Sequence, residues 1–296
     1  MEVGELIGGV LAGERRAIAR AISAVEDGAP ELEPLSSGIY ASTGRAATIG
    51  ITGAPGVGKS TLAGELVRLA RDRDLSAAIL AVDPTSPYTG GALLGDRVRM
   101  QDHATDPRVF IRSMATRGHL GGMALAAPEA VRILDAAGYD RVIVETVGVG
   151  QAEVEVAAAT DTAVVVLAPG LGDAVQMAKA GILEVADVFV VNKADRDGST
   201  EVMRELRQML HLGAARDWDP PVLPTSAQSG EGVDDLWEAI ETHHAHVAGS
   251  GALAARRRTR LVQEVESLAA ERFRREAAAA PSARIAQAPP TTPEAG

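Results

Sequence analysis

One glycine-rich segment constrains the fold of this chain more than any other feature. It lies between an apolar run at 47–52 and a helix-like stretch at 61–67, with the spacing G-x-x-x-x-G-K-S. This order is typical of a phosphate-binding loop, in which backbone N–H groups and a helix N-terminus face phosphate oxygens. We expect Lys59 to reach the β- and γ-phosphates of a nucleoside triphosphate, and Ser60 to ligate Mg²⁺. The predicted nucleotide-binding residues here are Gly53, Ala54, Pro55, Gly56, Val57, Gly58, Lys59, Ser60 and Thr61.

Short β-branched runs alternate with helical stretches between residues 47 and 247. Such alternation is typical of an α/β fold with a doubly wound, mainly parallel sheet that is covered by helices on both faces. Ligands of these sheets bind at the carboxyl ends of the strands, where the glycine-rich segment also falls. The predicted strands are 49–52, 78–82, 109–112, 141–145, 163–167, 188–192 and 222–225.

The chain divides into four predicted parts. These are an N-terminal helical segment, a P-loop domain, a C-terminal helix and a disordered tail, at 1–45, 46–248, 249–276 and 277–296. Within the first part, Ser36-Ser37-Gly38 is expected to belong to the loop that leads into the first strand. The C-terminal helix is rich in arginine, and we expect its arginines to be solvated or to contact a partner. The tail is Ala-rich and then Pro/Thr-rich, a composition that does not support a packed core.

The overall composition excludes several classes of protein. A formal net charge of −11 and the absence of cysteine are its main features. An acidic chain is a poor general ligand for nucleic acids or membrane surfaces, so we expect neither partner. Without cysteine there are no disulfides and no thiolate sites, which fits a cytoplasmic protein. We find no apolar run of about 18 residues and no basic leader, so we expect no membrane segment or signal peptide.

A second motif, Asn192-Lys193-Ala194-Asp195, follows a predicted strand and predicts the base of the nucleotide. The carboxylate of Asp195 can accept hydrogen bonds from N1–H and the 2-amino group of guanine, whereas adenine offers neither donor. Each buried polar group left unmatched costs about 1–3 kcal/mol, enough for strong selection of GTP over ATP. We expect Lys193 to lie along the base and Asn192 to tie this loop to the phosphate-binding loop. A further loop resembles the one that meets guanine O6 in GTPases, at Ser226, Ala227 and Gln228.

The predicted strand that ends in Glu145 has the arrangement of a Walker B strand. A carboxylate at this position holds Mg²⁺ directly or through water. We expect Gly148 to offer its N–H to the γ-phosphate. Gln151 is a weak candidate for orienting the attacking water, because a Ras-type GTPase places its glutamine closer to the glycine. We therefore expect slow intrinsic hydrolysis that a partner raises.

A Gly/Pro/Thr-rich loop at 83–100 carries a carboxylate near each end, Asp83 and Asp96. A loop of this kind can be ordered by the γ-phosphate and Mg²⁺ and released on hydrolysis. Alternatively, Asp83 is a turn residue and Asp96 is the N-cap of the following helix. The spacing alone leaves both interpretations open.

Several segments together resemble the MeaB/MMAA/ArgK group of P-loop GTPases. The resemblance extends from about residue 10 to 247. It rests on D-P-x-S and T-G-G from residue 83, L-G-D-R-x-R-M from 94, R-G-x-L-G-G from 117 and E-T-V-G-V-G-Q from 145. It implies a P-loop NTPase of the SIMIBI type, in the form of a homodimer that hydrolyses GTP to GDP. Such proteins are chaperones that gate cofactor loading and protect adenosylcobalamin-dependent acyl-CoA mutases, typically methylmalonyl-CoA mutase.

The resemblance also implies residue roles. Asp83, Asp96 and Glu145 would surround Mg²⁺ and the attacking water, with Ser60 as a direct ligand, and Lys59 completes the catalytic set. Segment 169–179 corresponds to a third switch, in which Gln176 and Lys179 would couple the mutase to hydrolysis. These two residues are three positions apart and share a helix face.

Two departures from the family pattern concern the partner and the dimer. Tyr88 stands where the mutase-linked branch commonly has Arg. The C-terminal arm, which helps to build the dimer in the family, is shortened. The identity of the mutase and the geometry of the dimer therefore stay open.

Two other functions compete with this interpretation. A metallochaperone GTPase would need Cys or His ligands, and the available cluster is His243-His244-Ala245-His246. We expect that cluster to cap or decorate a helix end instead. A small-molecule kinase would need a second substrate pocket, which no motif specifies, and the N-K-x-D motif favours a guanine-nucleotide switch.

Overall fold

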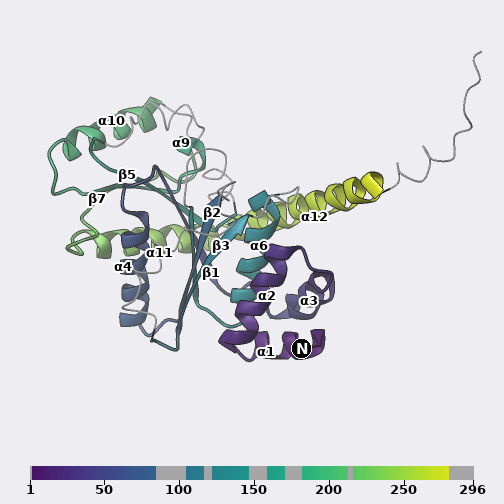
Figure 1. Ribbon diagram of the computed structural model, residues 1–296. Coiled ribbons are helices and arrows are strands. Elements are labelled where there is room, and N and C mark those ends of the chain that lie inside the picture. Colours follow the sequence, from purple (N-terminus) through teal and green to yellow (C-terminus); the bar gives the residue numbers. More distant parts are fainter. Residues whose placement is uncertain are drawn as a thin grey trace, which may run out of the picture.

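The computed structural model describes residues 2–84, 105–116, 122–146, 159–170, 182–212 and 216–279. Within these ranges seven strands form one sheet in the order β3-β2-β4-β1-β5-β6-β7, and all neighbouring strands are parallel (Figure 1). The α/β architecture is confirmed, and each of the seven predicted runs is a strand. The strands are β1 (Ala47–Thr52), β2 (Ala77–Pro84), β3 (Val109–Thr116), β4 (Arg141–Thr146), β5 (Thr162–Leu167), β6 (Val188–Asn192) and β7 (Val222–Thr225).

Alternating side chains of the strands fill cores on both faces of the sheet. In β4, Ile143 packs with the cluster under α4 (Lys59–Asp72) and α11 (Val233–Gly249). Its neighbours Val142 and Val144 pack on the opposite face, with α6 (Gly122–Ala136) and the N-terminal helices. Figure 1 shows α4 and α6 on opposite sides of the strands. Further along the sheet, α9 (Ile182–Val185) and α10 (Ser199–Leu212) cover β5, β6 and β7.

Three helices precede the sheet, α1 (Val3–Leu11), α2 (Arg15–Asp27) and α3 (Leu32–Ile39), with a short 3-10 turn at Tyr40–Ser42. The expected loop at 36–38 is wrong, because these residues lie in α3. Leu35 and Ile39 are one helical turn apart and both are buried, which outweighs the turn preference of Ser-Ser-Gly. A Cβ on Gly38 would come within 2.5 Å of Ile7, so this glycine permits the close approach of α1 and α3.

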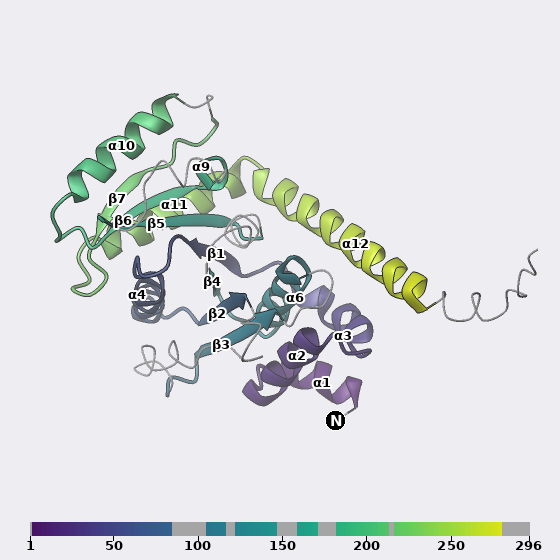
Figure 2. The same cartoon turned by 45° about the horizontal axis from the view of Figure 1, so that its top comes forward.

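The last described helix, α12 (Ala252–Ala279), extends beyond the body of the molecule. It follows α11 and passes α6, and its far end stands away from the other elements (Figure 2). The predicted C-terminal helix is present. Residues 277–279 continue it, and the rest of the predicted tail lies outside the described residues. Among the helices of the described ranges, none has the length and apolar character needed to span a membrane.

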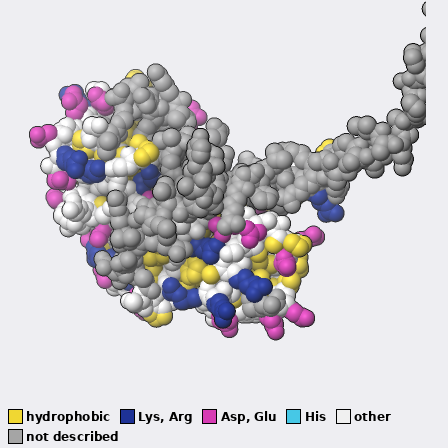
Figure 3. Space-filling model, viewed as in Figure 1, with side chains coloured by type: hydrophobic (Ala, Val, Ile, Leu, Met, Phe, Trp, Pro, Cys, Tyr) yellow, Lys and Arg dark blue, Asp and Glu magenta, His cyan; other side chains and the backbone are white. Residues whose placement is uncertain are grey.

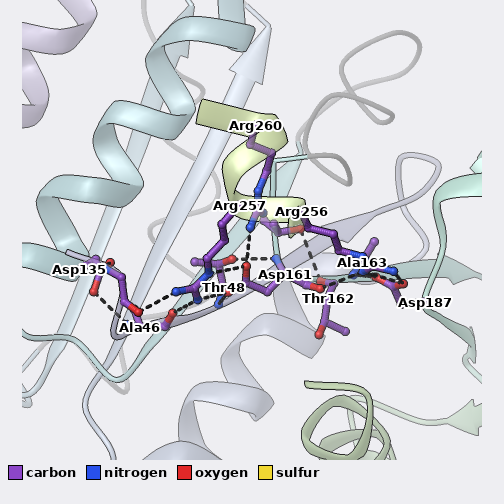
Figure 4. A network of polar contacts seen from close by, with 12 residues as sticks. Ala46, Thr48, Asp135, Asp161, Thr162, Ala163, Asp187, Arg256, Arg257 and Arg260 are labelled. Carbon is purple, nitrogen blue, oxygen red and sulfur yellow. Dashed lines mark hydrogen bonds and ion pairs between the residues drawn. The ribbon is translucent and has the colours of Figure 1, made fainter. Parts of the chain in front are cut away.

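Three arginines at the start of α12 bind carboxylates at the amino-terminal edge of the sheet, as Figure 4 shows. Nη2 of Arg257 and Nη2 of Arg260 each lie 2.5 Å from a carboxylate oxygen of Asp161. Arg256 pairs with Asp187 at 3.2 Å. The expectation that the arginines of this helix are solvated or contact a partner is therefore wrong for Arg257 and Arg260, whereas the Arg256 side chain is 42% exposed.

Asp161 is fully buried just before β5. Its carboxylate also accepts the backbone N–H of Thr48 in β1. Burial raises the pKa of this carboxyl group, but the hydrogen bond from Arg257 and the charges of Arg260 and Arg257 outweigh that effect and hold the pKa at about 2. The same Arg257 donates to the carbonyls of Gly44 and Ala46, so α12 is attached to the chain just before β1.

The histidine cluster at 243–246 is part of this edge of the sheet. His243 is fully buried, with Nδ1 2.8 Å from the hydroxyl of Thr162 and Nε2 3.1 Å from Asp187. The expectation that the cluster caps or decorates a helix end is wrong for His243, because its ring lies inside the core, whereas His246 is exposed in the last turn of α11. In the described part of the chain, no group of three or more His, Asp or Glu side chains is arranged to hold a metal ion.

Candidate nucleotide site

The phosphate-binding loop joins β1 to α4 at the carboxyl edge of the sheet, as predicted. Gly53, Gly56 and Gly58 all have positive φ, at 139°, 79° and 101°. A Cβ on Gly53 would lie 2.1 Å from the carbonyl oxygen of Val166, and a Cβ on Gly58 would lie 2.3 Å from Nδ2 of Asn192. Glycine is therefore required here for both backbone conformation and space, and α4 begins directly after the loop at Lys59.

The side chain of Lys59 folds back over the loop. Its Nζ donates to the carbonyls of Gly53 at 2.6 Å and Ala54 at 3.1 Å, and the residue is 6% exposed. The ammonium group is thus held inside the curl of the backbone. A cation in this place is positioned to meet phosphate oxygens that enter the loop.

Ser60 and Glu145 meet from neighbouring elements. The Ser60 hydroxyl, in the first turn of α4, donates to Oε1 of Glu145 in β4 at 2.6 Å. Glu145 is 1% exposed. A hydroxyl and a carboxylate are the hard oxygen ligands that Mg²⁺ prefers, so this pair fits the predicted metal. The two residues are 85 positions apart in the chain, and the sequence predicts that both bind one Mg²⁺ ion.

Asn192, at the end of β6, connects three loops. Its Nδ2 donates to the carbonyl of Val57 at 2.8 Å, which is the expected tie to the phosphate-binding loop. Its Oδ1 accepts the N–H of Ala227 at 3.0 Å and the hydroxyl of Thr225 at 3.1 Å. The phosphate-binding loop and the two predicted base loops are therefore fixed to one amide group.

The next residues of this loop continue toward solvent. Lys193 has φ 59° and its Nζ donates to the carbonyl of Gly56 at 2.6 Å. Its side chain thus lies against the phosphate-binding loop in this structure. Asp195 is exposed, so its carboxylate is accessible to a ligand. Ser199, at the start of α10, closes the loop by donating to the carbonyl of Ala194 at 3.1 Å.

The third predicted loop is a tight turn after β7. Ser226 and Ala227 are buried and Gln228 is exposed. The backbone N–H of Ser226 donates to the carbonyl of Glu231, and those of Ser229 and Gly230 donate back to Ser226. The turn holds the backbone of 226–228 beside Asn192, where it can line a base pocket.

Sequence reasoning missed two residues that shape these loops. The hydroxyl of Thr225 shares Oδ1 of Asn192 with the N–H of Ala227. Gly232 has φ 73°, and a Cβ there would lie 2.3 Å from the carbonyl oxygen of Pro224. The position of Thr225 directly before Ser-Ala-Gln is the signal that could have identified it.

The remaining predicted residues are placed only in part. Asp83 lies in β2 beyond the level of Glu145, because Ala81 pairs with Glu145 and Val82 with Thr146. Its backbone is therefore at the same edge of the sheet as the phosphate-binding loop. The other predicted residues of this site lie outside the described residues, and they are Asp96, Gly148, Gln151, Gln176 and Lys179.

Comparisons with known proteins agree with this geometry. Residues 18–282 match the family model described as "Methylmalonyl Co-A mutase-associated GTPase MeaB". A protein of Pyrococcus horikoshii, named as a GTPase, is 51% identical over 272 residues, which cover 90% of this chain and 86% of that protein. The mouse protein named "Methylmalonic aciduria type A homolog, mitochondrial" is 38% identical over 216 residues, covering 71% of this chain and 52% of its own length.

One solved structure shares the fold over most of the chain. The crystal structure of a LAO/AO transport system kinase is 30% identical and superposes with a TM-score of 0.75. The likeness covers 95% of this chain and 87% of the other. The described sheet, the loops at its carboxyl edge and the helices around them are thus an arrangement that other proteins share.

Proposed function

The chain belongs to the MeaB family of GTPases, and on this premise we propose that it is a chaperone for an adenosylcobalamin-dependent acyl-CoA mutase. Hydrolysis of GTP would gate the loading of the cofactor and protect the mutase. Methylmalonyl-CoA mutase is the first client to test, because the family description names that enzyme. The match over residues 18–282 is the observation that carries the proposal.

We propose the following roles for the residues of the site. Backbone N–H groups of 53–60 would bind the phosphates, while Lys59 would exchange its loop carbonyls for β- and γ-phosphate oxygens. Ser60 and Glu145 would hold Mg²⁺, with Asp83, Asp96 and Gly148 completing the γ-phosphate side. When bound, Mg²⁺ neutralises charge on the phosphates. Asp195 would select guanine, since its carboxylate matches the two donors of that base.

The third switch would connect the nucleotide site to the mutase. Gln176 and Lys179 lie in this segment, outside the described residues. The segment follows β5, whose Val166 carbonyl contacts the phosphate-binding loop at Gly53. The described start of the segment, residues 169 and 170, therefore follows closely after a strand that adjoins the phosphate-binding loop. This placement supports the proposal that Gln176 and Lys179 couple partner binding to hydrolysis.

A homodimer and a cytoplasmic location complete the proposal. Support for the dimer comes from α12, where three apolar side chains are exposed, Val262, Val265 and Phe273. Exposed apolar side chains at helical spacing favour burial against another surface. The location rests on the sequence-based expectation.

The proposal is tested by GTP turnover with and without purified methylmalonyl-CoA mutase. We expect the mutase to raise turnover, and Lys179→Ala to abolish most of that increase while basal turnover stays within about twofold. Arg204→Ala, which removes an exposed cation on α10, is the matched control and should keep the stimulation.

Two results would contradict the proposal. A large loss of basal turnover in the Lys179→Ala variant would remove its coupling role. Capture from native lysate of a hydrogenase or urease precursor in place of an acyl-CoA mutase would favour metal insertion.

A further inference from the structure

Two buried threonine hydroxyls meet beside the nucleotide site. Thr52 is the last residue of β1, and Thr146 is the last residue of the neighbouring strand β4. The Thr146 hydroxyl donates to Oγ1 of Thr52 at 3.3 Å. Both residues are 1% exposed or less. This contact therefore joins the carboxyl ends of the two strands inside the protein.

Each threonine adjoins a residue that the proposed site uses. Thr52 directly precedes Gly53, the first residue of the phosphate-binding loop. Thr146 directly follows Glu145, which accepts the Ser60 hydroxyl on the α4 face of the sheet. Because side chains alternate along a strand, Thr146 lies on the opposite face from Glu145. The hydroxyl contact thus joins β4, the strand that carries the Glu145 carboxylate, to β1 on the face opposite that carboxylate.

Packing alone gives no reason for hydroxyls at these two positions. Valine has nearly the same shape and an equal preference for strands, and the neighbouring positions are held by Ile51 and Val144. A buried hydroxyl costs free energy unless it is hydrogen bonded. At 3.3 Å the contact is long for an O–H···O hydrogen bond, so it depends closely on the spacing of the two strand ends.

We propose that Thr52 and Thr146 are positioning residues that set the spacing between the phosphate-binding loop and Glu145. Through this spacing they govern how well the site takes up Mg²⁺ with GTP. The inference rests on the proposed role of Ser60 and Glu145 in holding Mg²⁺. Neither threonine contacts the nucleotide in this assignment, since their side chains lie inside the sheet on the opposite face from Glu145.

The test compares Thr52→Val, Thr146→Val, the double variant and Thr146→Ser with the unmodified full chain. Three quantities are measured: the Mg²⁺ concentration for half-maximal GTP turnover, the affinity for GDP in excess EDTA, and the melting temperature. We expect each Val variant to raise the Mg²⁺ requirement about threefold to tenfold, the effect of losing one hydrogen bond. The affinity for GDP in EDTA should change less than about twofold.

The contact between the two hydroxyls predicts two further results. The double variant should be no worse than either single variant, because both remove the same contact. Thr146→Ser keeps the hydroxyl and should restore the Mg²⁺ requirement. Thr162→Val is the matched control, since it removes a buried hydroxyl that bonds His243 at the other edge of the sheet. It should lower the melting temperature and leave the Mg²⁺ requirement unchanged.

Three outcomes would overturn the inference. Additive effects in the double variant would show that the two hydroxyls act separately. If Thr146→Val changes only the melting temperature, as is expected for Thr162→Val, the hydroxyl contact stabilises the fold and does not position the site. Glu145→Gln distinguishes failure of the positioning role from failure of the proposed Mg²⁺ site. If it too leaves the Mg²⁺ requirement unchanged, the proposed role of Glu145 fails with the inference. If Glu145→Gln raises the requirement and Thr146→Val does not, only the inference fails.

Discussion

At the scale of single residues, we expect the choice of nucleotide to depend on the carboxylate of Asp195. Replacing it by an amide in Asp195→Asn substitutes a donor for one acceptor, which suits the 2-oxo group of xanthine better than the 2-amino group of guanine. We expect affinity for GTP to fall about tenfold or more and preference to move toward xanthosine triphosphate. Competition of the two nucleotides against a fluorescent guanine nucleotide measures both changes.

The control for this change is Asp197→Asn, two positions further along the same exposed loop. It alters charge by the same amount without altering the N-K-x-D motif, so GTP preference should persist. If Asp195→Asn leaves the nucleotide selectivity unchanged, the proposal that the loop at 192–195 binds the base is contradicted.

Single residues differ in how well the sequence predicts them. Gly58 and Asn192 belong to motifs with fixed spacing, and the structure brings them together: a Cβ on the glycine would strike the amide of Asn192. The pairing of Ser60 with Glu145 follows from the same motifs, since both segments end at one edge of a parallel sheet. The contact between Thr52 and Thr146 gave no such signal, because threonine is common in strands for packing reasons.

At the scale of elements, α12 is held by buried charge, and its attachment should depend on pH. Asp161 has a folded-state pKa of about 2, below the usual value near 3.8. A depressed pKa contributes stability above pH 4 that is lost as pH falls from about 4 to 2. For a fully buried carboxylate the shift amounts to about 2 kcal/mol. We expect urea denaturation to show this loss in the native chain, and a shallower pH dependence in Asp161→Asn.

Asp72→Asn provides the comparison, because Asp72 pairs with Arg68 on an exposed helix face where ion pairs contribute little. Its pH dependence should match that of the native chain. Arg260→Met supplies a second variant if Asp161→Asn does not fold, and it should raise the pKa of Asp161 and flatten the same transition. An unaltered pH dependence in both variants would contradict the role of Asp161.

The helices and strands were predicted correctly where the local sequence pattern determines them. Short β-branched runs between helical stretches identified all seven strands, because strands that are covered on both faces are apolar at successive positions. Helix α3 was missed because its turn-favouring residues are overruled by burial of Leu35 and Ile39. The partners of the α12 arginines were missed for a different reason: Arg257 and Asp161 are 96 positions apart, and no local pattern connects them.

At the scale of the whole molecule, the apolar side chains of α12 predict association of two copies. Val265 and Phe273 are 58% and 72% exposed in the single chain. Burying such side chains contributes about 25 cal/mol for each Å² removed from water. We expect the native chain to be dimeric, and the paired change Val265→Asp with Phe273→Asp to shift it toward monomer, as measured by analytical ultracentrifugation.

Leu212→Asp is the control, since Leu212 is 88% exposed at the end of a different helix, α10. It should leave the mass unchanged. A native chain that sediments as a monomer, or equal dissociation in the control, would contradict a dimer built on α12. On the face shown in Figure 3, acidic and basic side chains of the described residues are interspersed, so this face offers no continuous basic surface.

The attachment of α12 has a consequence for how the chain can be divided. A polypeptide ending at the predicted domain boundary, residue 248, would contain the predicted nucleotide-binding residues but not Arg257 and Arg260, the counter-charges of the fully buried Asp161. It would also lack Glu264, whose carboxylate binds Arg132 of α6. Leaving buried charges without partners is strongly destabilising. We therefore expect the smallest autonomous folding unit to reach at least Arg260, so that it includes the first turns of α12.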